Sequence, residues 1–399
     1  MPSNKRLTLG LLTGALGLGV GALILANSAD HEALANIDPP TEQTPPTLTS
    51  TKKKPAKVVV AAEPPKVDVV FVLDTTGSMS GLLSGAKRKI WSIANRIQNG
   101  QPRPEVRMGL IGYRDVGDDY VTRRYALTEN IDEVYSKLKR FRAGGGGDTP
   151  EHVNKGLDEA INKMQWRQGK GVLKLVFLVG DAPPHEGRGG LRSASLAQEA
   201  AQKGITINTV RCGRSGSTGR KFAKIASLSG GIYATIRQDG AMVARSTPYD
   251  KELAKLNDEL STTALHAGGE GTKRAYRSRM VGNRGMGSMS KADSATYRAR
   301  SGHLDSGDLL AQMKKGKKLH SFREAELPPA VAAKPMAQRR RYIRSVAKTR
   351  RRINKKILSL AKDRDAYLKK ARKGRGSSGF DDVLGGALKR QGEKAGIAY

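Results

Sequence analysis

The chain has 399 residues and a formal net charge of +34, and only 5% of its residues are aromatic. Its single cysteine, Cys212, excludes an internal disulfide framework and any cysteine-based metal cluster. The excess of Lys and Arg is concentrated after residue 239, which indicates a globular domain in the middle of the chain and a basic appendage behind it.

The N-terminal stretch of residues 7–26 is apolar and uncharged, and it follows Lys5 and Arg6. A helix needs about 20 apolar residues to cross a bilayer, and flanking basic residues stay on the cytoplasmic side. We therefore expect residues 1–36 to be a signal anchor or a signal peptide. The bulk of the protein would then be membrane-tethered outside the cytoplasm, periplasmic or at the cell surface, or secreted if the segment is cleaved. Residues 37–65, rich in Pro and Thr, are expected to be a linker.

From residue 66 to residue 238, short apolar runs alternate with amphipathic segments. The expected strands are residues 67–73, 106–113, 172–179, 205–210 and 232–236, with residues 120–127 as an edge strand that suits an antiparallel orientation. The expected helices are residues 82–97, 131–141, 153–164, 191–202 and 220–228. This alternation predicts an α/β domain with a doubly wound, mostly parallel six-stranded sheet.

The region after residue 238 has a weaker pattern. Residues 239–334 contain one short helical stretch at 253–265 and are otherwise predicted to be a flexible basic region. Residues 335–375 are predicted to form a long basic helix that pairs with itself or a neighbour. Its apolar positions follow three- and four-residue steps, at Ile343, Val346, Ile353, Ile357, Leu360 and Tyr367, with Arg350 and Arg364 interrupting the row. The tail, residues 376–399, keeps scattered apolar residues that would dock locally.

Basic clusters at residues 314–318 and 338–356 admit two interpretations. They could bind a polyanion or anionic lipid, or they could be the solvated faces of helices. We do not expect nucleic acid as the partner if the chain is exported.

Oxygen-bearing side chains follow two of the expected strands and one glycine-rich stretch. Asp74 ends the first strand, and Thr76 and Ser78 come at alternate positions after it. Asp148 and Thr149 follow four consecutive glycines, and Asp181 ends another apolar strand. The carboxyl ends of parallel strands meet at one edge of a sheet, and such oxygens are the ligands that hard divalent cations prefer.

These stretches resemble the metal-ion-dependent adhesion site of von Willebrand factor A domains. Residues 74–78 stand where that family has Asp-x-Ser-x-Ser, and residues 143–151 and 178–185 are similar to the G-G-G-D-x-P-E and G-D-A-P-P-H motifs of its prokaryotic branch. The resemblance implies that Thr76 and Ser78 bind the ion directly. It also implies that Asp74 and Asp181 act largely through water, and that one position is left for a carboxylate of a partner.

The third part of the motif departs from the family pattern. The position of the family's Thr falls on Asp148, with Thr149 next to it, and both remain candidates for facing the ion. An aspartate there adds negative charge, which favours firm binding of the cation and lowers the demand for an incoming acid. We expect Mg²⁺, with Ca²⁺ or Mn²⁺ as alternatives.

Other residues on the same rim are candidates for contact with a partner. Tyr113, Arg114 and Asp115 end a strand, and His185 follows two prolines; a surface ion pair and a hydrogen-bonded loop histidine are the alternative interpretations. No nucleophile–base pair and no phosphate-binding loop is visible, so we expect no enzymatic activity.

The sequence therefore predicts a membrane-tethered, metal-dependent module that binds a protein partner. The alternative hypotheses are a scaffold subunit of an enzyme complex, such as a chelatase-type ATPase or a kinase, and polyanion binding through the basic C-terminal region.

Overall fold

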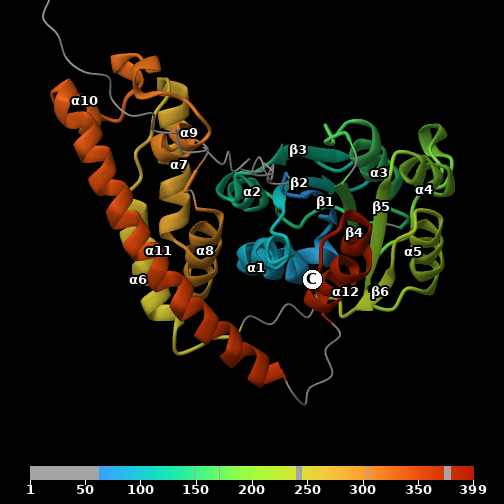
Figure 1. The fold of residues 1–399 in the computed structure, drawn as a ribbon. Helices are drawn as coiled ribbons and strands as arrows, with labels where there is room; N and C mark the ends of the chain where they lie inside the picture. Colours follow the sequence, from blue (N-terminus) through green and yellow to red (C-terminus); the bar gives the residue numbers. More distant parts are fainter. Residues whose placement is uncertain are drawn as a thin grey trace, which may run out of the picture. The chain divides into compact units, whose positions relative to one another are not determined.

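The computed structural model describes residues 63–147, 149–169, 171–239, 245–302, 304–305, 307–372 and 379–399. Its centre is a six-stranded sheet in the order β3-β2-β1-β4-β5-β6 (Figure 1). The strands are β1 Lys66–Asp74, β2 Glu105–Tyr113, β3 Thr122–Thr128, β4 Val172–Gly180, β5 Ile205–Cys212 and β6 Tyr233–Ile236. All neighbours pair in parallel except the edge strand β3, which is antiparallel to β2. This confirms the predicted six-stranded α/β fold.

Helices cover both faces of the sheet because each central strand is apolar on both faces. Val69 and Phe71 of β1 pack with α1 (Ser80–Gln98) and α2 (Ile131–Leu138). Val70 and Val72 point to the other face, where α3 (Val153–Asn162), α4 (Ser193–Gln202) and α5 (Gly216–Leu228) lie. Strands buried on both faces are typical of parallel sheets enclosed by crossover helices. Cys212, at the end of β5, is buried.

The C-terminal tail completes this core. It forms α12 (Phe380–Gly392), whose Phe380 ring lies 6.2 Å from that of Phe71 and 6.0 Å from that of Phe177, centre to centre. Gln391 exchanges hydrogen bonds with Asn208 of β5 at 2.6 and 3.0 Å. The sequence interpretation ended the α/β domain at residue 238, but its last helix comes from the far end of the chain.

The region predicted to be flexible, residues 239–334, instead contains helices. They are α6 Asp250–Thr262, α7 Glu270–Arg284, α8 Ser288–Ser301, α9 Leu309–Lys314 and α10 Pro329–Ala332. Of these, α6 matches the helical stretch expected at residues 253–265. Apolar periodicity did not reveal the others, because buried ion pairs replace part of their apolar contacts. Arg298 of α8, for example, donates to both carboxylate oxygens of Asp132, at 2.7 and 3.0 Å.

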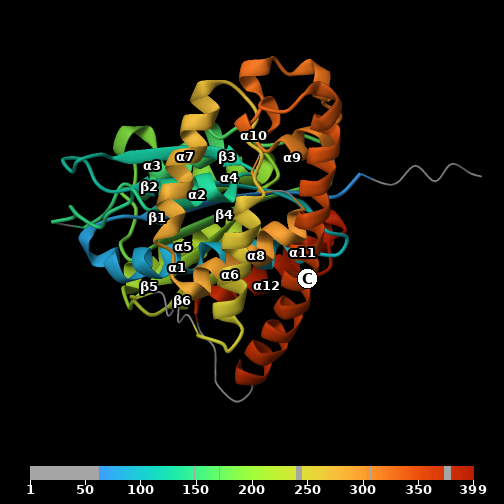
Figure 2. The same cartoon turned by 90° about the vertical axis from the view of Figure 1, so that its left-hand side faces the viewer.

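The predicted long basic helix is α11, Met336–Arg372, and it packs along α6 and α8 (Figure 2). The two arginines that interrupt its apolar row are buried and paired. Arg350 donates to Asp308 at 2.6 Å, and Arg364 donates to Asp250 and Asp293, each at 2.7 Å. The apolar row therefore binds neighbouring helices of the same chain, and the arginines belong to that contact.

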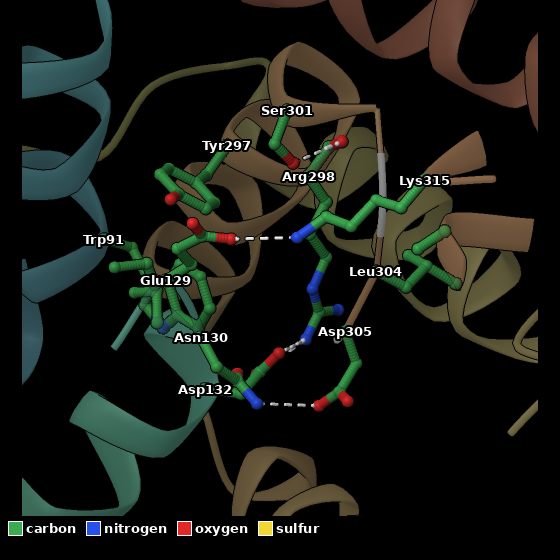
Figure 3. A pocket seen from close by; sticks show the side chains of 12 residues that line it. Trp91, Glu129, Asn130, Asp132, Tyr297, Arg298, Ser301, Leu304, Asp305 and Lys315 are labelled. Atoms are coloured by element: carbon green, nitrogen blue, oxygen red, sulfur yellow. Dashed lines mark hydrogen bonds and ion pairs between the residues drawn. The ribbon is translucent and has the colours of Figure 1, made fainter. Parts of the chain in front are cut away.

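A pocket between the α/β domain and α8 is lined by polar side chains that pair with one another (Figure 3). Arg298 reaches Asp132 there, Asn130 donates to Asp305 at 2.9 Å, and Lys315 pairs with Glu129 at 3.2 Å. Because the charged groups lining this pocket satisfy one another, we interpret it as a structural contact.

The predicted membrane segment, residues 7–26, and most of the predicted linker lie outside the described residues. Across the part of the chain that the structure describes, no helix combines the length and the apolar character needed to cross a membrane; the longest, α11, carries charged residues along its length. This finding contradicts the predicted localisation as a single-pass membrane protein, and we withdraw that prediction.

Candidate functional site

The candidate site lies where β1 and β4 end, side by side in the middle of the sheet. Asp74 is the last residue of β1, and Asp181 follows the last residue of β4. The parallel register pairs Leu73 with Val179, so both acids emerge at the same edge. The structure thus brings together the two predicted strand-end aspartates.

Asp74 is fully buried, and its two carboxylate oxygens differ in their surroundings. Its Oδ1 accepts hydrogen bonds from the backbone N–H of Thr76 at 2.9 Å and from the Thr76 hydroxyl at 2.7 Å. Its Oδ2 is buried and has no hydrogen-bond partner among the described residues. Burial, with a further contribution from the charge of Asp181, raises the pKa of Asp74 to about 7. A buried oxygen of this kind is expected where a further ligand binds.

Thr76 and Ser78 are close together, with their hydroxyl oxygens 3.4 Å apart. Thr76 is buried, whereas Ser78 is exposed at the rim. Their loop is held by its neighbours, since Thr75 donates from its backbone and its hydroxyl to the carbonyl of Tyr113, at 3.0 and 2.9 Å. The first loop therefore presents its two hydroxyls next to Asp74, as the sequence interpretation expected.

The glycine-rich loop runs against this first loop. Gly77 donates to the carbonyl of Gly145 at 3.1 Å. Gly146 has φ +72°, and a Cβ there would lie 2.9 Å from the Cβ of Thr76 and 3.0 Å from Oε1 of Glu151. A glycine is required at this position for the loop to approach the site so closely.

Of the two candidates that follow the glycines, Asp148 lies outside the described residues and Thr149 is exposed. The same loop also carries Glu151, a carboxylate that the sequence interpretation missed: it is buried, and its Oε2 lacks a hydrogen-bond partner within the described chain. Burial and the nearby charges of Asp74, Asp115, Asp118 and Asp181 raise the pKa of Glu151 to about 8. The sequence offered a signal, because Glu151 is the final residue of the G-G-G-D-x-P-E motif, but it was not among the predicted site residues.

Asp181 is partly exposed and is held by two groups. Gln238, just after β6, donates its amide to Oδ2 at 2.5 Å. The hydroxyl of Thr218 donates to the Asp181 backbone carbonyl at 2.9 Å. The same Gln238 amide lies 3.5 Å from the carbonyl of Ser78, so Gln238 bridges two of the three motif stretches. Sequence reasoning gave no signal for this glutamine.

The prediction that Tyr113, Arg114 and Asp115 form a partner surface is wrong for these three residues, which are all buried. Arg114 donates to the carbonyls of Thr75 at 3.2 Å and Arg142 at 2.8 Å, so it ties loops together. A strand end in a sheet covered on both faces leaves little of its side chains for a partner.

His185, the fourth predicted surface residue, is half-buried and bonded. Its Nε2 lies 2.9 Å from Oδ2 of Asp115, and Arg188 lies 3.3 Å from Oδ1 of the same acid. Although burial opposes ionisation, the His185 hydrogen bond and the charges of His185 and Arg188 keep the pKa of Asp115 below its ordinary value. This is the hydrogen-bonded loop histidine weighed as the alternative.

The donor set fits a hard divalent cation held partly by hydroxyls. Among the described residues, no group of three or more His, Cys, Asp or Glu side chains is arranged to hold a metal ion by itself. Thr76 and Ser78 add two hydroxyl oxygens, and Asp74 and Glu151 each carry a buried carboxylate oxygen that bonds to no residue in the described ranges. Oxygen donors with concentrated negative charge are what Mg²⁺, Ca²⁺ and Mn²⁺ bind.

Comparison with known proteins finds relatives of the α/β domain. Residues 68–238 match the family model of the von Willebrand factor A domain. The alpha-protein kinase vwkA of Dictyostelium discoideum is 30% identical over 122 residues, which cover 30% of this chain and 19% of that protein. The von Willebrand factor A domain-containing protein 7 of Mus musculus is 30% identical over 159 residues, covering 40% of this chain and 17% of that protein.

The chain thus spans less than a fifth of the length of each of these two relatives. Among solved structures, proximal thread matrix protein 1 from the mussel byssus, with zinc in its MIDAS motif, is 17% identical. It aligns over 44% of this chain and 43% of that one with a TM-score of 0.36.

Proposed function

We propose, from the premise that residues 68–238 are a von Willebrand factor A domain, that this chain binds a protein partner through a divalent cation. The cation would lie at the sheet edge formed by the ends of β1 and β4. We expect the domain to be a binding module without catalytic activity of its own. Its assignment to the prokaryotic branch of the family remains a prediction from the sequence motifs.

The observation that carries this proposal is the state of Asp74. A carboxylate that is fully buried, beside a second acid, with one oxygen that no described residue bonds, is costly for the fold. Binding a divalent cation would offset that cost, because its two positive charges balance most of the negative charge of Asp74, Asp181 and Glu151. Thr76 and Ser78 would contribute neutral oxygens, and Gln238 orients Asp181.

When bound, the cation would offer a coordination position at the rim for an acidic side chain of the partner. Three carboxylates in mutual electrostatic contact would hold the ion firmly. Mg²⁺ is the expected ion, with Ca²⁺ or Mn²⁺ as alternatives.

Affinity capture with three forms of the full chain tests the proposal. Wild type, Asp74→Asn and Asp68→Asn are compared as baits in Mg²⁺ and in EDTA. Asp68 is the matched control, because it is equally buried in β1 but is bonded to Arg107 at 2.6 and 2.9 Å, at a register position remote from the strand end. A partner retained by wild type and Asp68→Asn in Mg²⁺, and lost in EDTA or with Asp74→Asn, is expected. Capture of a partner that is unaffected by EDTA and by Asp74→Asn would contradict the proposal.

The scaffold hypothesis predicts a different outcome of the same capture. The D. discoideum relative is named as a kinase, but this chain covers only 19% of it. If the retained partner is an ATPase or a kinase, the domain is a subunit of an enzyme complex and the metal-dependent contact is its means of assembly.

We also propose, as a second candidate function, that α11 binds a linear polyanion. Seven exposed basic side chains on this helix are spaced by three, four or seven residues, so they share one face: Arg340, Arg344, Lys348, Arg351, Lys355, Lys362 and Lys369. None of them has a carboxylate within ion-pair distance in the described part of the chain. At 1.5 Å per residue they span about 43 Å, which suits a polymer lying along the helix.

Binding of inorganic polyphosphate to the full chain tests this second function. Charge reversal of Arg344, Arg351 and Lys355 should weaken binding by at least about tenfold and reduce its salt dependence. Reversal of the exposed Lys163 and Lys224 on the α/β domain is the control. Equal binding by both variants would contradict the proposal.

A further inference from the structure

A basic basin adjoins the candidate cation site. It is lined by Arg211, Gly213, Arg214, Thr235, Ile236, Arg237, Gln238 and Asp239, and it is open to solvent. It lies where β5 and β6 end, one strand further along the sheet edge than Asp181. The only acid among these lining residues is Asp239, so the basin carries a positive charge.

The three arginines of the basin have few competing partners. Arg211 donates from Nη1 to the carbonyl of Ser215 at 2.9 Å, and its Nε is buried without a hydrogen bond in the described chain. Arg237 pairs with Asp239 at 3.1 Å, but both side chains are largely exposed, at 75% and 53%. Such an exposed pair contributes little and is readily exchanged for another anion. Arg214 is exposed.

Gln238 joins the basin to the cation site. It lines the basin, and its amide also donates to Asp181 at 2.5 Å. A ligand that contacts the cation beside Asp181 therefore has the arginines within reach of its neighbouring residues. The basin and the cation site are parts of one continuous edge.

We infer that the partner segment is acidic at more than one position. One acidic side chain would complete the cation site, and further Asp or Glu residues of the same segment would enter the basin and pair with Arg211, Arg214 and Arg237. Arginine binds carboxylates in pairs of parallel hydrogen bonds, so the basin would distinguish a multiply acidic segment from one with a single acid. This inference rests on the proposed function.

The probe for the test is a fluorescein-labelled peptide of Gly and Ser with four consecutive Glu residues, measured by fluorescence anisotropy with the full chain in Mg²⁺. A second peptide carries one Glu and three Gln. The proteins are wild type, Asp74→Asn, and the double variant Arg214→Glu/Arg237→Glu, whose two sites are exposed and outside the core. Lys163→Glu/Lys224→Glu is the matched control for net charge, and urea unfolding verifies that each variant folds.

We expect wild type and the lysine variant to bind the four-Glu peptide at least about tenfold more tightly than the one-Glu peptide, and the arginine variant to lose that preference. Binding should also fall in EDTA and with Asp74→Asn. If the arginine variant binds like wild type, or if wild type binds both peptides equally, the inference about the basin is overturned while metal-dependent binding stands. If binding is lost in the arginine variant but does not respond to EDTA or Asp74→Asn, the proposed function fails and the basin binds acids without a cation.

Discussion

Removing the charge of Asp74 should stabilise the cation-free protein. Burial, with the charge of Asp181, raises the pKa of Asp74 from 3.8 to about 7. At about 1.4 kcal/mol per pKa unit, the ionised carboxylate costs the fold about 4 kcal/mol. Because the pKa is raised, this cost is fully present above pH 7 and fades as the pH falls below it. In Asp74→Asn, the amide oxygen can still accept both hydrogen bonds from Thr76.

The stability gained by Asp74→Asn is smaller than the full cost of the buried charge. The amide N–H₂ that replaces Oδ2 needs acceptors of its own, and an unmade hydrogen bond costs about 1–3 kcal/mol. We expect Asp74→Asn to raise the free energy of unfolding by about 2 kcal/mol in EDTA, measured by urea unfolding at about pH 8. Mg²⁺ at one hundred times its Kd should stabilise wild type by about 2.7 kcal/mol and leave Asp74→Asn unchanged.

Asp68→Asn is the control from the same strand. Asp68 is equally buried but is fully paired, by Arg107 and by Arg167 at 3.0 Å. Breaking such a buried pair should destabilise the fold by about 3–5 kcal/mol while the response to Mg²⁺ is retained. The reasoning is refuted if Asp74→Asn is less stable than wild type in EDTA, or if it gains as much from Mg²⁺ as wild type does.

Three further predictions concern neighbouring features. Glu151→Gln removes one of the buried carboxylates and should weaken Mn²⁺ binding by about tenfold or more, since the cation loses one of its compensating charges. An unchanged affinity in isothermal titration calorimetry would exclude Glu151 from the site. Gly146→Ala should destabilise the fold by about 1–2 kcal/mol and weaken cation binding, because Gly146 has φ +72° and lies close to Thr76. Gly147→Ala should do neither, because a Cβ at Gly147 meets nothing within 4 Å. Equal effects of the two substitutions in urea unfolding would contradict this. Burial lowers the pKa of His266 to about 4. Its neutral form therefore contributes stability above about pH 6.5 that is lost as the pH falls toward 4. Across that range the free energy of unfolding should fall less for His266→Gln than for wild type, and parallel curves would argue against it.

The sheet and the strand-end aspartates could be predicted because they depend on local patterns. The run from Val69 to Leu73 is typical of a strand buried on both faces, and the register of a parallel sheet then places Asp74 and Asp181 at one edge. Helix α11 followed in the same way from its three- and four-residue spacing.

The parts that were missed depend on contacts between residues far apart in the chain. Gln238 bonds to Asp181 across 57 positions, and Phe380 packs on Phe71 across more than 300. Buried ion pairs such as Arg364 with Asp250 make a charged sequence form a packed helical region, and no apolar period reveals such pairs. The burial of Tyr113 and Arg114, which we had predicted to contact a partner, was missed because burial at a strand end depends on the loops that cover it.

Titration of Mn²⁺ into the full chain, followed by isothermal calorimetry, decides whether the three loops hold a cation. We expect one ion per chain for wild type and for Asp68→Asn, and no binding for Asp181→Asn. Absence of binding to wild type, or unchanged binding to Asp181→Asn, would contradict the existence of the site.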